Sequence, residues 1–222
     1  MMRRASGKKS VIAPHSVLHP VADIPRKTVY RLSLYLRCLG LMVARQESIV
    51  SSAALASVAG VQPAQLRKDL AFCGPLGKRG SGYEVVVLRN RLEEILGRAS
   101  LQPVILVGTG NLGMALLRYK GFAREGFEIV SAFDLQPQKA ADGNIPVQSM
   151  KRLAPVIKRR EVRMAILCVP GTAAQQVAEQ LVEAGIHAIL NFSPALLHLP
   201  DTVAVNNVNL AIELENLSYF AR

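Results

Sequence analysis

Cysteine is scarce in this chain, and its placement excludes two frequent uses of the residue. The three cysteines among 222 residues, Cys38, Cys73 and Cys168, are widely spaced and odd in number, and none belongs to a Cys-x-x-Cys pair. Disulfide frameworks and zinc sites are recognised by paired or closely spaced cysteines. We therefore expect neither, and we expect all three side chains to be buried as small apolar groups.

Long apolar runs are also missing. Half of the residues are apolar, which is enough for one large core or two modest ones, yet no run approaches the length of a membrane span. The first residues carry Arg3, Arg4, Lys8 and Lys9 without the apolar core of a signal peptide. These absences predict a cytoplasmic protein that has no contact with a membrane.

Acidic residues are few in the first half only. Residues 1–100 contain 16 lysines and arginines against 6 aspartates and glutamates, whereas residues 101–222 contain 11 against 10. Such asymmetry indicates a polyanionic partner, which a basic surface binds by neutralising phosphates and releasing counterions. A basic surface that serves solubility alone is the alternative. We interpret the excess as a sign that the first half binds nucleic acid.

The first hundred residues are predicted to form an arm followed by helices. Residues 1–22 mix basic, small and proline residues without periodicity, which predicts a flexible basic arm. Ser51 and Ser52 offer N-caps for a short helix that ends near Gly60. Before it, Pro25 suits the start of a longer helix, in which apolar residues recur at spacings of three and four: Val29, Leu32, Leu36, Leu39 and Met42.

A third helix and a glycine-rich turn complete a predicted DNA-binding domain at residues 23–100. The helix opens at Gln62-Pro63 and directs Gln65, Arg67 and Lys68 outward, while Leu66, Leu70 and Phe72 face inward. A basic turn with Lys78 and Arg79 at its tip leads to Tyr83 and to a strand-like run at 84–88. Three helices and a basic hairpin in this order are typical of a winged helix-turn-helix, whose third helix reads base edges in the major groove.

The second half contains a dinucleotide-binding pattern within a predicted domain at residues 101–205. An apolar strand at 103–107 leads into a helix through a Gly-x-Gly-x-x-Gly sequence, Gly108-Thr109-Gly110-Asn111-Leu112-Gly113. The first glycine allows a tight turn, the second allows a pyrophosphate to approach the backbone, and the third allows close packing of helix and strand. The helix N-terminus supplies N–H groups to the phosphates. This pattern predicts a Rossmann domain.

The remaining strands predict where the nucleotide binds. A second strand at 128–133 ends at Asp134, and an acid there accepts hydrogen bonds from the adenosine ribose and repels a 2′-phosphate, which favours NAD(H). Strands at 162–169 and 187–192 complete an α/β fold with a doubly wound parallel sheet, whose ligand lies beyond the carboxyl ends of the strands. We therefore add five residues to the predicted crevice: Val169, Pro170, Asn191, Phe192 and Ser193.

Groups for catalysis are missing around this crevice. The second half has two histidines, His187 at the head of a strand and His198 in a loop, and neither belongs to an acid–base constellation. No Tyr-x-x-x-Lys pair, paired-carboxylate motif or nucleophile elbow is present. We therefore expect the nucleotide to be a signal and the protein not to be an enzyme.

An amphipathic helix is predicted in the C-terminal segment at 206–222. Its apolar residues can cover the chain's own sheet or the surface of a partner. A reader with one short recognition helix usually binds as a two-fold dimer on an inverted repeat. We interpret the helix as a dimerisation element.

Taken together, these residues resemble the Rex family of bacterial redox-sensing repressors from Ile24 to the end of the chain. The matching stretches are spread over both halves: Ile24-Pro25, Tyr35-Leu36-Arg37, Gln65 to Leu70, Gly77 to Tyr83, Val107 to Gly113, Tyr119 to Phe122, Phe133-Asp134, Val169-Pro170 and Asn191 to Pro194. The resemblance implies a homodimer whose C-terminal helices exchange between subunits. It also implies binding to AT-rich inverted repeats of double-stranded DNA, release from DNA by NADH, and binding in the presence of NAD+.

The chain departs from this family at two informative places. Family members usually carry aspartate at Asn209, an acid implicated in coupling the nicotinamide to an arginine that matches Arg37 here. Asparagine hydrogen bonds but cannot form that ion pair, so the strength of the NADH response is open. Tyr119 is a candidate to report the nicotinamide state to the dimer interface. The second departure is Ala71-Phe72-Cys73-Gly74 in place of Ser-Tyr-Phe-Gly, which predicts a changed operator preference and makes Cys73 an alternative oxidation sensor.

Two other classes of protein fit parts of the pattern. One is an NAD-dependent oxidoreductase with an added basic domain, which the lack of proton-handling groups opposes. The other is a Rossmann module that binds CoA, because a similar glycine turn can hold its pyrophosphate. Asp134 argues against CoA, which carries a 3′-phosphate on its ribose.

Overall fold

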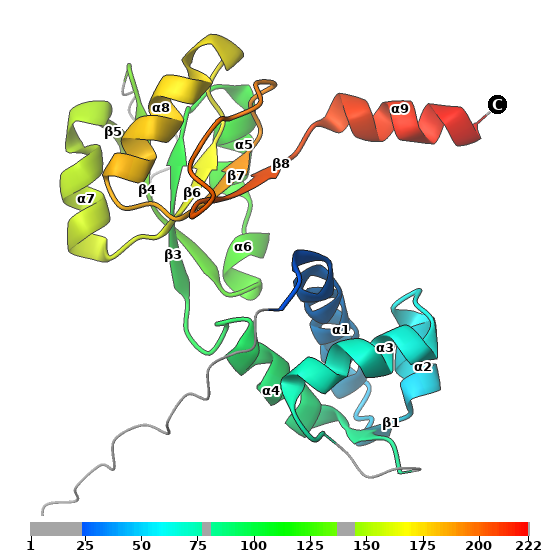
Figure 1. Ribbon diagram of the computed structural model, residues 1–222. Helices are drawn as coiled ribbons and strands as arrows, with labels where there is room; N and C mark the ends of the chain where they lie inside the picture. Colours follow the sequence, from blue (N-terminus) through cyan, green and yellow to red (C-terminus); the bar gives the residue numbers. More distant parts are fainter. Residues whose placement is uncertain (1–23, 77–80, 137–144, 222) are drawn as a thin grey trace, which may run out of the picture. The chain divides into compact units, whose positions relative to one another are not determined.

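The computed structural model describes residues 24–76, 81–136 and 145–221 (Figure 1). The chain divides into two compact units, Met1–Leu96 and Gly97–Arg222, close to the predicted boundary at residue 100. The predicted arm at 1–22 and the predicted contact residues Lys78 and Arg79 lie outside the described residues. No helix within the described ranges is long and apolar enough to cross a membrane.

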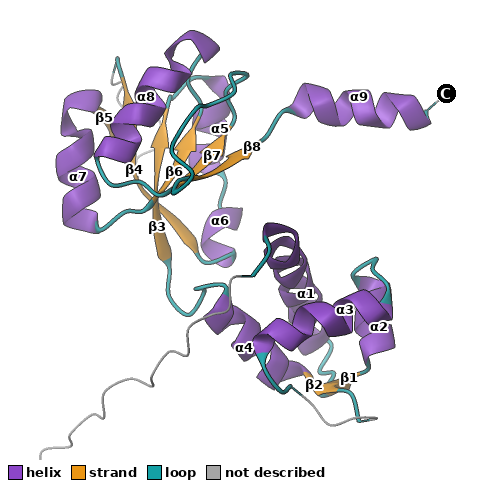
Figure 2. Cartoon of the chain, in the orientation of Figure 1, coloured by secondary structure: helices purple, strands orange, loops and turns teal. Residues whose placement is uncertain are grey.

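Unit 1 is a helical domain with one short β-ladder (Figure 2). Ser51 caps the second helix as predicted, because its hydroxyl accepts a hydrogen bond from the N–H of Ala54 at 3.0 Å. Apolar side chains from all four helices form a single core. The elements are α1 (Arg26–Ala44), β1 (Ile49–Val50), α2 (Ser52–Val58), α3 (Pro63–Leu70), the 3₁₀ turn η1 (Ala71–Cys73), β2 (Tyr83–Glu84) and α4 (Val85–Ile95).

The strand predicted at 84–88 is wrong beyond its first residue. Only Tyr83–Glu84 is a strand, which pairs antiparallel with Ile49–Val50, and α4 begins at Val85. Val85, Leu88 and Leu92 are buried on one face of this helix, whereas Val86 and Val87 are exposed. The helical spacing of the buried residues therefore outweighs the preference of valine for strands.

Phe72 also differs from its predicted inward orientation. It is exposed, while its neighbour Cys73 is buried at 1% exposure. The cause is the end of α3 at Leu70, after which η1 changes the rotation per residue and directs Cys73 toward the core instead.

Unit 2 is a doubly wound α/β domain, which confirms the predicted fold class. Its six strands are parallel and lie in the order β5-β4-β3-β6-β7-β8. They are β3 (Gln102–Val107), β4 (Phe127–Asp134), β5 (Val147–Ser149), β6 (Met164–Leu167), β7 (Ala188–Asn191) and β8 (Ala204–Asn207). The edge strands β5 and β8 were not predicted, because each is short and lacks a buried apolar run.

Helices cover both faces of this sheet. Ile105 and Val107 of β3 pack with α7 and α8, whereas Val104 and Leu106 pack with residues of α5 and α6, as the alternation of side chains along a strand requires. The covering helices are α5 (Asn111–Arg118), α6 (Gly121–Arg124), α7 (Leu153–Arg160) and α8 (Gly171–Glu183), with the 3₁₀ turn η2 at Met150–Arg152. The C-terminal α9 (Leu210–Phe220) follows β8 and has no buried residue.

Candidate functional site

The glycine turn after β3 has the backbone that its sequence predicts. Gly108 has a φ of +95°, and a Cβ there would lie 2.6 Å from the carbonyl carbon of Cys168. A Cβ on Gly113 would collide with the carbonyl oxygen of Gly108. A Cβ on Gly110, in contrast, would meet nothing within 4 Å. Two of the glycines are therefore required by the fold, and Gly110 leaves open space in front of the N-terminus of α5.

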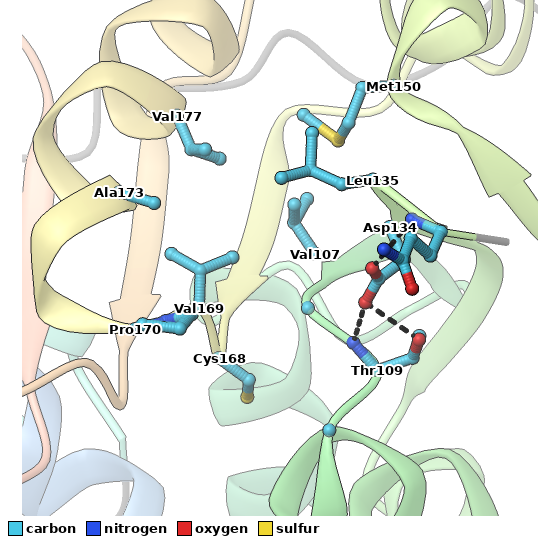
Figure 3. Close-up of a pocket in the computed structure, with 13 residues that line it drawn as sticks. Val107, Thr109, Asp134, Leu135, Met150, Cys168, Val169, Pro170, Ala173 and Val177 are labelled. Atoms are coloured by element: carbon cyan, nitrogen blue, oxygen red, sulfur yellow. Dashed lines mark hydrogen bonds between the residues drawn. The ribbon is translucent and has the colours of Figure 1, made fainter.

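Asp134 holds this turn from the end of the neighbouring strand β4. Its Oδ2 accepts hydrogen bonds from the backbone N–H of Thr109 at 2.7 Å and from the Thr109 hydroxyl at 2.8 Å, as Figure 3 shows. Its Oδ1 accepts from the N–H of Gln136 at 3.1 Å. Burial alone would raise the pKa of Asp134, but these hydrogen bonds outweigh burial and hold its pKa below the ordinary value. The side chain is thus a carboxylate at neutral pH.

A cavity of about 590 Å³ opens beside Asp134 and the glycine turn. Its walls include six predicted residues: Gly108, Thr109, Gly110, Asp134, Val169 and Pro170. Apolar side chains that the prediction missed complete it, among them Leu135, Met150 and Val177, which face the same space (Figure 3). The cavity lies at the ends of β3, β4 and β6, where the strand order reverses and where such sheets bind ligands.

Three further predicted residues, Asn191, Phe192 and Ser193, do not line this cavity. Asn191 ends β7 and the other two residues follow it, one strand beyond the reversal point. Asn191 is fully buried and donates to the carbonyl of Ala195 at 2.9 Å and to Oδ1 of Asn207 at 2.8 Å, while it accepts from the N–H of Ser193. Within the chain these residues support the loop after β7 and join β7 to β8.

Asn111, Leu112 and Gly113 lie in the first turn of α5 and do not line the cavity. Tyr119 lies at the other end of that helix, 60% exposed, with its ring edge-to-face against Phe122 at 5.1 Å. It borders a separate hollow of about 760 Å³ that Met114 and Phe127 also line. One copy of the chain therefore does not bring Tyr119 to the glycine turn.

In unit 1, α3 presents the predicted DNA-contacting side chains. Arg67 and Lys68 are exposed, and Arg67 donates to the hydroxyl of Ser52 on α2 at 3.2 Å. Gln65 is half-buried, and Tyr83 is half-buried on β2. The exposed face of α3 is thus basic and polar, as a major-groove helix requires.

A polar cluster behind α3 was not predicted from the sequence. Asp69 is 1% exposed and accepts hydrogen bonds from side chains on α1 and from Gln65. Thr28, Arg31 and Tyr35 recur at spacings of three and four on one face of α1. This polar spacing on α1, together with an aspartate on the basic helix α3, is the sequence pattern that could have predicted the cluster.

Two of the three predicted coupling residues, Arg37 and Asn209, lie on the surface of α1 and at the start of α9. Arg37 is exposed on α1. Asn209 caps α9, because its Oδ1 accepts hydrogen bonds from the N–H groups of Ala211 at 3.0 Å and Ile212 at 3.3 Å. Aspartate at this position would cap the helix equally well.

Comparisons with known proteins agree with this architecture. Residues 23–71 match the family model "Putative DNA-binding protein N-terminus", and residues 100–195 match the model "CoA binding domain". The redox-sensing transcriptional repressor Rex of Syntrophobacter fumaroxidans is 43% identical over 201 residues, which is 89% of this chain and 96% of that protein. Rex of Desulfitobacterium hafniense is 43% identical over 88% of this chain and 94% of that protein.

Solved structures of a Rex-family repressor, RSP, have the same fold. RSP in complex with NAD+ and operator DNA superposes with a TM-score of 0.82 at 35% identity, covering 89% of this chain and 92% of that one. The complex with NADH gives a TM-score of 0.78 at 34% identity, covering 90% of this chain and 95% of that one. On this likeness in sequence and in fold, the chain belongs to the Rex family of redox-sensing transcriptional repressors.

Proposed function

We propose that this protein represses transcription by binding operator DNA through unit 1 and leaves the DNA when NADH occupies the cavity of unit 2. The observation that carries the proposal is the cavity itself, in which an ionised Asp134 and an open Gly110 meet at the glycine turn. Relatives of the same fold bind NADH, NAD+ and operator DNA.

Asp134 supports NAD(H) as the ligand. Its carboxylate lies at the end of β4 beside the cavity, where the adenosine ribose of a dinucleotide binds in Rossmann domains. A carboxylate there accepts hydrogen bonds from ribose hydroxyls and repels the 2′-phosphate of NADP(H). The apolar side chains of the opposite wall supply a dry surface for the nicotinamide end.

CoA is the second candidate ligand, because residues 100–195 match a CoA-binding family model. The same repulsion disfavours it, since its ribose carries a 3′-phosphate. Calorimetry with NADH, NAD+, NADPH and CoA separates the two ligands. We expect heat from NADH and NAD+, and tight binding of CoA alone would contradict the assignment.

The DNA-binding form is a homodimer on an AT-rich inverted repeat. Every residue of α9 is exposed in the single chain, including Leu214, Leu217 and Phe220. Within the described residues α9 thus buries no apolar side chain of its own, and exchange of this helix with a second copy covers them. Two recognition helices related by a two-fold axis then match two half-sites one helical turn apart.

Ligand control requires only that NADH bind one arrangement of the dimer more tightly than the other. The arrangement that NADH favours places the two α3 helices at a spacing that does not match the operator. Tyr119, Arg37 and Asn209 are the proposed coupling residues between the nicotinamide and the DNA-binding unit. No proton transfer is needed, so the nucleotide acts as a signal.

A mobility-shift titration tests the DNA-binding part. One duplex carries an AT-rich inverted repeat with half-sites one turn apart, and the control duplex has the same half-sites separated by an additional half turn. We expect tight binding to the first duplex only. Equal affinity for both would contradict a two-fold dimer that reads paired half-sites.

A further inference from the structure

The helix α3, which is proposed to face the DNA, carries one acidic residue, Asp69. This residue lies next to Arg67 and Lys68, in the half of the chain where acids are few. At 1% exposure its carboxylate is removed from water, and a buried carboxylate is costly unless it is paired. The partners of Asp69 must therefore offset the free-energy cost of burying its carboxylate.

The carboxylate is fully partnered by two helices. From α1, Arg31 donates through Nε at 2.6 Å and Nη2 at 2.7 Å, and the Tyr35 hydroxyl donates at 2.8 Å. The Thr28 hydroxyl is 3.4 Å from Oδ1. From α3 itself, Gln65 donates through Nε2 at 2.9 Å. Burial raises the pKa of Asp69, but the hydrogen bonds from Arg31, Tyr35 and Gln65 outweigh burial and lower its pKa below the ordinary value.

The bond to Gln65 fixes the orientation of the amide. An ionised carboxylate only accepts hydrogen bonds, so the amide nitrogen, and not Oε1, must face Asp69. The nitrogen carries two hydrogens, and one is used by Asp69. When the hydrogen donated to Asp69 is the one trans to Oε1, the second hydrogen lies on the same edge of the amide as Oε1, and a donor and an acceptor remain side by side.

We propose that Asp69 is a positioning residue for DNA recognition, which orients the Gln65 amide as an adenine-reading group on α3. This inference rests on the proposed DNA-binding function. Adenine presents an N7 acceptor and an N6 donor in the major groove, and glutamine pairs with both through this donor–acceptor edge. Because the amide is oriented before DNA arrives, less side-chain freedom is lost on binding. Arg67 and Lys68, for which the described residues show no bond to a buried acid, serve phosphates.

The test measures base discrimination by the full-length protein. Fluorescence anisotropy gives affinities for an operator series in which each base pair of the half-site is replaced in turn, at fixed salt. The proteins are the wild type, Gln65→Ala, Asp69→Asn and Lys68→Ala. We expect the wild type to lose about tenfold in affinity on replacement of one A·T pair. Gln65→Ala and Asp69→Asn should lose this preference at that same pair and keep the others, whereas Lys68→Ala should weaken binding to all duplexes alike.

A second measurement covers the case in which Asp69→Asn fails to fold. The side-chain amide of Gln65 is observed by NMR in the free wild-type protein, with Tyr35→Phe as a variant that keeps the Gln65–Asp69 bond. We expect an amide proton protected from exchange in both proteins. A rapidly exchanging Gln65 amide, or a folded Asp69→Asn protein with unchanged preference at every pair, would overturn the inference. A wild-type protein that binds none of the duplexes would instead overturn the DNA-binding function on which the inference rests.

Discussion

Gly110 and Gly113 belong to one motif but serve different ends. A Cβ on Gly113 collides with the Gly108 carbonyl, whereas a Cβ on Gly110 meets no protein atom within 4 Å. We predict that Gly113→Ala lowers the melting temperature, and that Gly110→Ala folds normally but binds NADH at least tenfold more weakly, a loss of about 1.4 kcal/mol. Circular dichroism and calorimetry measure the two effects. Unchanged NADH affinity in Gly110→Ala would contradict the placement of the pyrophosphate.

Asp69 and Asp134 make the stability of the protein depend on pH in the acid range. The folded protein lowers the pKa of both carboxyls, so each contributes stability that is present above its unfolded pKa of about 3.9. That stability is lost as the pH falls through the folded pKa. We predict that Asp134→Asn flattens the fall in melting temperature between about pH 5 and pH 2. Asp201→Asn, at an exposed position, is the control, and equal slopes for the wild type and Asp134→Asn would contradict the role of Asp134.

The cysteines are predicted to be unreactive in the folded protein. Burial raises the pKa of Cys73 to about 11 and of Cys168 to about 11, although Cys168 is only partly buried, against the prediction, and borders the cavity. At neutral pH both are thiols and not thiolates, which opposes the alternative of Cys73 as an oxidation sensor. Iodoacetamide at pH 7.5 should label native protein slowly and unfolded protein fully. Rapid labelling of native Cys73 would restore the sensor interpretation.

At the scale of elements, the sequence predicts best the features that depend on neighbouring residues, such as helix caps and glycine turns. The starts of α1, α2 and α3, the glycine turn and the position of Asp134 at the end of β4 agree with the prediction, whereas Val29 on α1 and Phe72 after α3 are exposed against it. The strand at 84–88 failed because burial against α1, and not valine's preference, decides that segment. Asn191 was predicted in the crevice because it ends a strand of the sheet, but the cavity lies at the reversal point between β3 and β6 and Asn191 does not line it. The spacing of Thr28, Arg31 and Tyr35 marks a polar face on α1, but no local pattern identifies its partner Asp69, which lies 38 residues after Arg31.

The apolar side chains of α9 are predicted to hold two chains together. Leu214 and Leu217 are both exposed in the single chain. We expect Leu214→Glu combined with Leu217→Glu to shift the protein from dimer to monomer in sedimentation, because each glutamate would have to be buried unpaired in the dimer. Glu213→Gln is the matched control on the same helix. A lower melting temperature with no change in mass would show instead that α9 covers its own chain.

At the scale of the whole molecule, we predict that Asn209 affects the strength of the response to NADH. Asparagine and aspartate cap α9 equally, so Asn209→Asp changes the charge at this position and leaves the helix intact. If the acid couples the nicotinamide to Arg37, the variant should be released from DNA at a lower NADH concentration. An unchanged midpoint of NADH-induced release would contradict that coupling.

The central prediction is that the protein binds operator DNA and dissociates from it when it binds NADH. The most direct measurement is fluorescence anisotropy of a labelled AT-rich inverted-repeat duplex with the full-length protein, at fixed salt, titrated separately with NADH and with NAD+. We predict that NADH releases the protein from the duplex and that NAD+ leaves the protein bound. Tight binding that responds to neither nucleotide would contradict redox control.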